Sequence, residues 1–166
     1  MKKISDNMES LINSQIKREH TNALTYLAMS NWLDYNGWSG AAKLYNSYYN
    51  DEISHRDKFI EYLLDLDALP MPINDCDGEI SKEYKNIEDV INLTYDRECM
   101  TTENIKNLKT AAYKESDFIT IDFLDFFINE QIEELSKTMY WIDRVSMFKE
   151  TNTPLSFLDK EMEAKA

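Results

Sequence analysis

Glu52 and His55 are the residues whose types and spacing point most directly to chemistry, and they lie in a predicted helix from about Ser39 to Asp67. Residues three apart on a helix project side by side from one face. The rest of this face is apolar or aromatic: Ala41, Tyr45, Tyr48, Phe59, Leu63 and Leu66. Burying a carboxylate and an imidazole without partners costs several kcal/mol, and a bound cation removes that cost. Mixed oxygen and nitrogen ligands suit iron, zinc or manganese, and paired Glu-x-x-His repeats are typical of di-iron and di-manganese helical bundles.

A single Glu-x-x-His pair also occurs by chance, as a surface ion pair or a helix-internal hydrogen bond, so a metal site needs ligands from other helices. Three further long helices are predicted: Ser5 to Tyr35, a third capped by Asn86, and a fourth from near Ser116 to about Lys149. Each has an apolar stripe that ligand-capable side chains interrupt near its middle: Glu19, then Glu98, then Gln131 with Glu134. Chance explains one interruption easily but four poorly, because each buries a charge that only neighbours or a cation can compensate. The sequence therefore predicts an all-α four-helix bundle around a metal centre.

The connections between the helices indicate how the bundle is joined. From Ala68 to Asn86 the chain contains Pro70, Pro72 and Gly78, which forbid a continuous helix. A connection of this length can cross the whole bundle, so the second and third helices are predicted to run parallel.

The ends of two helices give more local predictions. Ser39 is the predicted cap of the second helix. A short fifth helix follows Thr153, with Pro154 at its first helical position. Its apolar residues are predicted to form a patch that needs a partner subunit: Leu155, Phe157 and Leu158.

Composition bounds the other possibilities. With 166 residues the chain is expected to form a single domain, 1–166. Its net charge of -13 argues against a nucleic-acid partner, and either favours cations or simply keeps a helical protein soluble. No apolar run is long enough for a signal peptide or a membrane helix, so we expect a cytoplasmic protein without a membrane partner. Cys76 and Cys99 form no Cys-x-x-Cys pair and are expected to be ordinary thiols.

Several stretches make the chain resemble the bacterial non-haem ferritins over essentially its whole length. The segments that carry the resemblance are Gln15-Ile16-Lys17-Arg18-Glu19, Asp51-Glu52-Ile53-Ser54-His55, Tyr95-Asp96-Arg97-Glu98, Phe123-Leu124, Asn129-Glu130-Gln131-Ile132-Glu133-Glu134 and Phe157-Leu158-Asp159-Lys160-Glu161. The resemblance implies a ferroxidase centre within each subunit, which oxidises Fe(II) with O2 or H2O2. It also implies a homo-oligomeric shell of 24 subunits that stores ferric mineral.

The resemblance also implies roles for individual residues. Glu19, Glu52 and His55 would hold the first iron, with Glu52 bridging, while Glu98 and Glu134 would hold the second, with Gln131 beside it. Tyr26 matches a tyrosine near the centre, where it would hydrogen-bond the site or supply an electron, although a half-buried core tyrosine is an equal alternative. A third, weaker iron site would take its ligands from Asp51, Glu130, Glu133 and Glu134.

Departures from related families refine these expectations. Bacterioferritins place a haem-ligating Met after the bridging Glu, but this chain has Ile53, so no haem is expected. The fourth helix has no histidine beside Gln131 and Glu134, so the second iron should be held more loosely. Asp51 stands where Glu is usual, which weakens the third site.

One further pair concerns iron uptake. Asp122 and Asp125 match carboxylates that line threefold iron channels in eukaryotic ferritins, and they would attract Fe(II); otherwise they belong to a solvated acidic face.

Three other functions remain open at this point. A DNA-protecting miniferritin would form a 12-subunit cage with its iron site between subunits. A non-catalytic helical-bundle interaction protein would carry a vestigial site. A di-iron oxygenase would need a pocket for an organic substrate, of which the tyrosine-rich second helix gives no sign.

Overall fold

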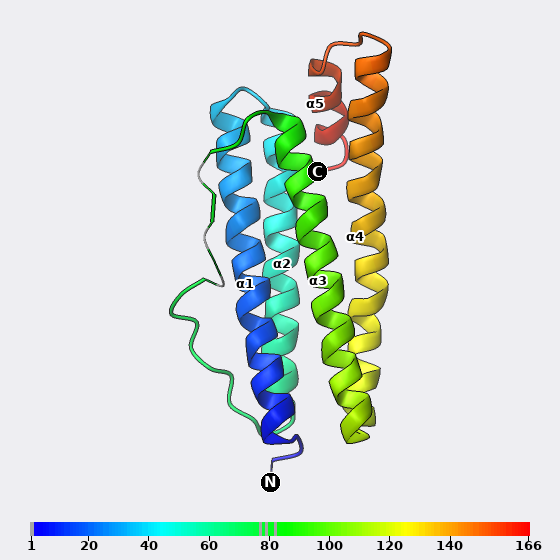
Figure 1. Cartoon of the computed structure of the whole chain (residues 1–166). Coiled ribbons are helices and arrows are strands. Elements are labelled where there is room, and N and C mark those ends of the chain that lie inside the picture. The colour runs from blue at the N-terminus through cyan, green and yellow to red at the C-terminus, as the bar shows by residue number, and fades with distance from the viewer. Residues whose placement is uncertain (1, 77, 79, 82) are drawn as a thin grey trace.

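The protein is a long four-helix bundle with a short fifth helix (Figure 1). The computed structural model describes residues 2–76, 78, 80–81 and 83–166. The helices are α1 (Asp6–Tyr35), α2 (Ser39–Asp65), α3 (Ile87–Glu115), α4 (Phe118–Glu150) and α5 (Ser156–Glu163). Within that part of the chain no residue is in a β-strand, which confirms the predicted all-α class. None of the described helices is both long and apolar enough to cross a membrane.

Side-chain caps begin three of the long helices. Ser5 accepts a hydrogen bond from the Met8 amide at 3.0 Å, and Asn86 accepts one from Asp89 at 2.8 Å, as its sequence predicts. The predicted Ser39 cap is wrong, because Ser39 is already helical and the preceding Trp38 makes no side-chain cap. The turn before α2 is instead closed by its backbone, with the Trp38 amide donating to the Leu33 carbonyl at 2.9 Å.

The connection between α2 and α3 runs back along α1, so α2 and α3 are parallel as predicted (Figure 1). Polar contacts hold the connection against α1 over several turns. The Met71 amide donates to the Asn13 side chain at 2.7 Å, and Asp75 pairs with Lys17 at 2.9 Å. Near its far end, Tyr84 packs edge-to-face on Trp32.

The core consists of two apolar clusters with a polar layer between them. One cluster surrounds Tyr45 and Trp141, near the α5 end of the bundle, and the other surrounds Phe59 and Phe127. The polar residues buried between the clusters come from all four long helices: Glu19, Glu52, His55, Glu98 and Gln131. Buried charged groups cost more free energy than apolar side chains at the same positions. This layer is therefore the part of the core that requires a functional explanation.

Helix α5 packs on its own subunit, which corrects the prediction about its apolar residues. Leu158 is fully buried and lies in the cluster that contains Tyr45, so it needs no partner subunit, whereas Phe157 is 52% exposed. Gly40 permits the close approach of α5, because a Cβ at this position would lie 2.0 Å from the Asp159 carbonyl oxygen. The Asp159 carboxylate accepts a hydrogen bond from the Ala41 amide at 2.8 Å. Pro154 lies before the helix rather than at its first helical position.

Candidate metal centre

The polar layer gathers the side chains that the sequence predicts as ligands. Glu19, Glu52 and Glu98 are 5% exposed or less, and His55 is 7% exposed. Gln131 is also buried, while the Glu134 side chain keeps 12% of its surface exposed. The four long helices thus bring six groups to the same level of the bundle.

Three of these residues form one compact ligand group. Glu19, Glu52 and His55 each offer one ligand atom, and these atoms lie within 4.8 Å of one another. Gln15 donates a hydrogen bond to one oxygen of Glu19 at 2.7 Å. The second oxygens of Glu19 and Glu52 are buried without any hydrogen-bond partner. Two orphaned carboxylate oxygens beside an imidazole fit a transition-metal cation, which would supply the missing interactions.

The carboxylates of the layer hold their protons unusually tightly without a cation. Burial, aided by the charge of Glu52, raises the pKa of Glu19 well above its ordinary value. Burial, followed by the charge of Glu98, raises the pKa of Glu52 to about 8. The pKa of Glu98 rises to about 7, again chiefly through burial. Carboxylates that repel one another in a low-dielectric site attract a multivalent cation strongly, because it favours the charged form of each.

The second half of the layer is organised around Glu98. The Tyr26 hydroxyl donates to one of its oxygens, and the Gln131 amide donates to the other at 3.0 Å. Burial, with the charge of Glu98, raises the pKa of Tyr26 well above its ordinary value, so Tyr26 is a protonated donor. The predicted position of Tyr26 beside the centre is therefore found, and Glu98 is oriented from two sides.

Glu134 has a partner that the sequence reasoning missed. Its carboxylate pairs with the Lys137 ammonium at 2.7 Å, one turn further along α4. Burial alone would lower the pKa of Lys137. The hydrogen bond to Glu134 and the negative charges of Glu134, Asp51 and Glu130 have the larger combined effect, so the pKa of Lys137 is raised. The spacing of three residues in the sequence was the available signal for this pair.

The residues predicted for a third site are less closely grouped. Asp51 and Glu133 are exposed, and Glu130 is partly buried with one oxygen 3.5 Å from the His55 Nε2. The compact ligand group found among the described residues contains Glu19, Glu52 and His55 but none of the residues predicted for the third site.

The predicted uptake residues lie away from this layer. Asp122 and Asp125 are both exposed near the start of α4, and Asp125 pairs with Lys109 of α3. His20, next to Glu19 in the sequence, is turned toward Arg56, with 3.2 Å between its Nδ1 and a guanidinium nitrogen.

Asn22 is a buried residue that the sequence reasoning also missed. It donates to the Thr101 hydroxyl and accepts from Arg97, both at 3.0 Å. The Asn22 side chain also opposes part of the upward pKa shift that burial causes at Glu52. Polar residues in α1 at a spacing of three from Glu19 were the only sequence signal for it.

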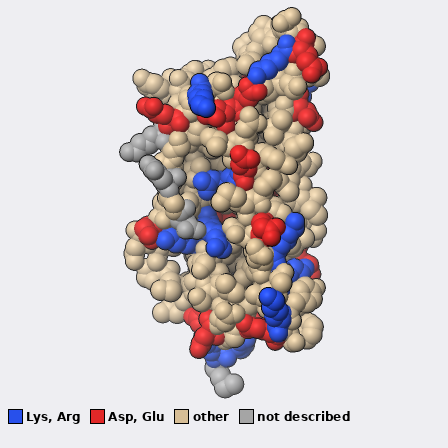
Figure 2. Space-filling model, in the orientation of Figure 1, with Lys and Arg blue, Asp and Glu red and all other residues tan. Residues whose placement is uncertain are grey.

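Charge on the molecular surface is mixed. On the face seen in Figure 2, acidic and basic side chains are scattered among uncharged ones, and the described residues of this face form no broad basic patch.

Comparison with known proteins places the chain among the ferritins. The family model of the ferritin-like domain matches residues 9–148. A probable bacterial non-heme ferritin-like protein of Haemophilus influenzae is 30% identical over 159 residues, covering 96% of this chain and 95% of that protein. A bacterial non-heme ferritin of Escherichia coli is 31% identical over 151 residues, which cover 91% of this chain and 90% of that protein. An open pore ferritin from the hyperthermophilic archaeon Archaeoglobus fulgidus has a TM-score of 0.91 and 26% identity, covering 96% of this chain and 98% of that chain.

Proposed function

The chain belongs to the ferritin-like family, whose members include the bacterial non-heme ferritins, and on this premise we propose that it oxidises Fe(II) at its buried carboxylate layer and stores the product as ferric mineral. Membership of the family implies iron storage. The ferroxidase step and the closed shell of 24 copies are parts of the proposal, as is a single ferritin-like domain that spans residues 1–166.

One observation carries the proposal: Glu19 and Glu52 each bury an oxygen without a partner beside His55. These three residues are assigned to the first iron, with Glu52 shared. Glu98 and Glu134 are assigned to the second iron, with Gln131 beside it. A third, weaker site over Asp51, Glu130, Glu133 and Glu134 stays a prediction.

The iron ions are substrates in this scheme. Each of two Fe(II) ions gives up one electron, and O2 takes both electrons with two protons to become H2O2. With H2O2 as the oxidant, the same two electrons break its O–O bond and give two hydroxide ions. Carboxylate oxygens are hard ligands, which favour the ferric product over the ferrous substrate. Tyr26 and Gln131 hold Glu98 in place through their hydrogen bonds.

The second site has no histidine, so its ligands are carboxylates and an amide. We therefore expect it to bind iron less tightly than the first site, as suits a centre that passes oxidised iron onward. Hydrolysis of the released Fe(III) builds the mineral and liberates protons.

The test compares oxidation of added Fe(II) by the wild-type assembly and by a double variant, Glu52→Ala with His55→Ala. We expect a loss of more than about 100-fold in the initial rate, since even outer-shell partners of a metal site contribute roughly 10–100-fold. The matched control is Glu61→Ala with His20→Ala, which removes the same residue types outside the layer. An unchanged rate in the first double variant would favour a bundle with a vestigial centre, and a shell of 12 subunits would favour the miniferritin class.

A further inference from the structure

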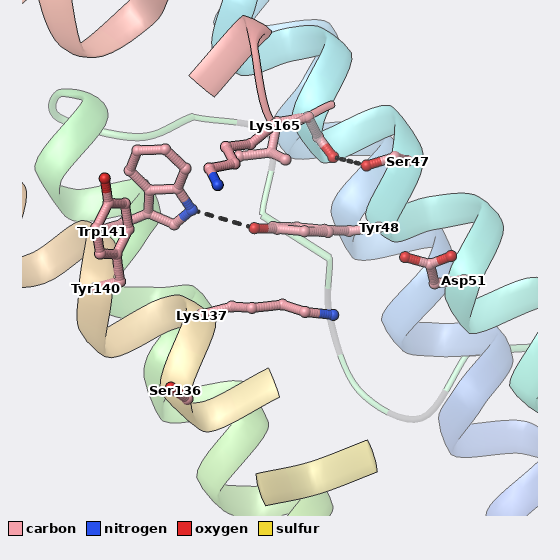
Figure 3. Close-up of a pocket in the computed structure, with 9 residues that line it drawn as sticks. Ser47, Tyr48, Asp51, Ser136, Lys137, Tyr140, Trp141 and Lys165 are labelled. Atoms are coloured by element: carbon pink, nitrogen blue, oxygen red, sulfur yellow. Dashed lines mark hydrogen bonds between the residues drawn. The ribbon is translucent and has the colours of Figure 1, made fainter. Parts of the chain in front are cut away.

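An opening lies between α2 and α4, and its lining includes Asp51, the residue directly before Glu52 (Figure 3). Its volume is about 500 Å³, and its walls include Tyr48 and Asp51 of α2 and Trp141 of α4. Lys137 extends across this opening from α4 toward α2, and its ammonium lies on the side of Asp51 (Figure 3). The second lysine of the opening, Lys165, lies further from Asp51 in the same view.

The ammonium of Lys137 therefore lies among acidic side chains. It pairs with Glu134 at 2.7 Å, and it is within the electrostatic influence of Asp51 and Glu130. Glu130 also approaches His55 at 3.5 Å, so this acidic group adjoins the first ligand set. Three of the four residues predicted for the third iron site therefore already interact with a positive charge, the Lys137 ammonium. They are Asp51, Glu130 and Glu134.

We propose that Lys137 is a positioning residue whose ammonium competes with iron for Glu134, Asp51 and Glu130, and so keeps the number of firmly held Fe(II) ions at two per subunit. The inference rests on the proposed function. An iron at the third site would have to displace the ammonium from Glu134 or accept a like charge beside it. The Lys137 side chain is 45% exposed and borders an open volume, so the ammonium has room to move aside when iron passes through.

The same contact makes Glu134 the adjustable ligand of the centre. Glu98 is fixed by two hydrogen bonds from other helices, whereas the Glu134 carboxylate pairs, among the described residues, with a lysine of its own helix. Iron at the second site therefore exchanges the ammonium for a metal bond at Glu134, and the reverse exchange helps the oxidised ion to leave.

The test measures how many Fe(II) ions the assembled protein binds anaerobically, by calorimetric titration at fixed protein concentration. Lys137→Met keeps most of the length of the side chain without its charge, and we expect its firmly bound iron to rise from about two to about three per subunit. Lys137→Arg retains the charge and should stay at about two. Lys165→Met removes the other ammonium of the opening and should also stay at about two. Anomalous scattering from crystals soaked in Fe(II) under anaerobic conditions should place the additional ion of Lys137→Met among Asp51, Glu130 and Glu134.

Each outcome separates this inference from the proposed function. Two ions in both wild type and Lys137→Met would overturn the inference and leave the ferroxidase proposal intact, as would three firmly held ions in wild type. A third ion in Lys165→Met would also overturn it, because any loss of charge in the opening would then suffice. Absence of bound iron in wild type would contradict the proposed function itself. If Lys137→Met does not assemble, Lys137→Gln is measured in its place with the same expectations.

Discussion

The Tyr26 hydroxyl donates a hydrogen bond to the Glu98 carboxylate, and both side chains are buried, with Tyr26 in the apolar cluster that contains Tyr45. The bond joins α1 to α3 at the level of the candidate metal centre. Because the pKa of Tyr26 is strongly raised, its hydroxyl stays protonated and remains a hydrogen-bond donor. Glu98 is therefore positioned before any metal binds.

Replacing this tyrosine should weaken the second iron site more than the first. Tyr26→Phe removes the hydrogen bond and leaves an oxygen of Glu98 without a partner, at a cost of about 1.5–3 kcal/mol for a bond to a charged group. We expect roughly 10-fold or greater loss of affinity at the second site and slower initial oxidation, measured by anaerobic titration and stopped-flow absorbance.

The matched control for that prediction is Tyr45→Phe. Tyr45 is equally buried, but its hydroxyl bonds to Thr94 at 2.9 Å and touches no carboxylate of the centre. Equal losses in the two variants would mean that Tyr26 acts through general core stability and not through Glu98.

The metal-free protein should lose stability as the pH rises. The folded-state pKa values of Glu52 and Glu98 are about 8 and about 7, above the ordinary value of 4.5, so the folded state binds more protons than the unfolded state between these limits. The free energy of unfolding therefore falls with increasing pH from about 4.5 to about 8, by ~1.4 kcal/mol per pH unit for each extra proton held. Urea unfolding of the metal-free protein from pH 5 to pH 8.5 measures the slope.

A bound divalent cation should flatten that dependence, because it replaces the protons of the carboxylates. Zn(II) is the suitable probe, since it undergoes no redox reaction. A metal-free protein whose stability rises or stays constant over this pH range would show that the buried carboxylates are compensated in some other way.

The two apolar residues of α5 should have different effects when shortened. Leu158 is fully buried on its own subunit, so Leu158→Ala should lower the free energy of unfolding by about 2–5 kcal/mol. Phe157 is 52% exposed, so Phe157→Ala should change subunit stability little and should instead reduce assembly if this ring contacts a neighbouring copy. Urea unfolding and native mass measurement on both variants separate these effects, and a large stability loss in Phe157→Ala would contradict the described position of its ring.

The predicted uptake residues can be tested through their charge. Asp122→Asn with Asp125→Asn should slow iron uptake at low ionic strength by about 10-fold, the lower end of electrostatic steering, and should abolish most of its salt dependence. Asp34→Asn with Asp65→Asn removes two exposed charges elsewhere and serves as the control. Unchanged uptake kinetics in the first double variant would leave Asp122 and Asp125 as parts of a solvated acidic face, a role already suggested for Asp125 by its pairing with Lys109.

The buried face of each long helix could be predicted from the sequence, because the periodicity of apolar residues in a helix indicates which face is buried. Glu19, Glu52 and Glu98 interrupt apolar stripes, and each is found buried at the same level. The Asn86 cap was also predictable, since a cap depends only on residues within one turn.

The features that the sequence did not reveal depend on tertiary distances. Lys137 was unremarked because its role comes from the opening between α2 and α4, which no local pattern describes. The docking of α5 depends on the contact of Gly40 with Asp159, residues more than a hundred positions apart. The cap of α2 was wrongly assigned to Ser39 because a backbone turn, and not a side chain, closes the start of the helix.

The central claim is best tested by anaerobic titration of the metal-free assembly with Fe(II), followed by exposure to O2, with absorbance and particle mass recorded on the same sample. The account predicts about two bound ferrous ions per subunit, their rapid oxidation, and then mineral growth inside a shell of 24 subunits. Binding and oxidation without a mineral-filled shell would contradict the storage role, and failure of the buried layer to bind Fe(II) would contradict the account as a whole.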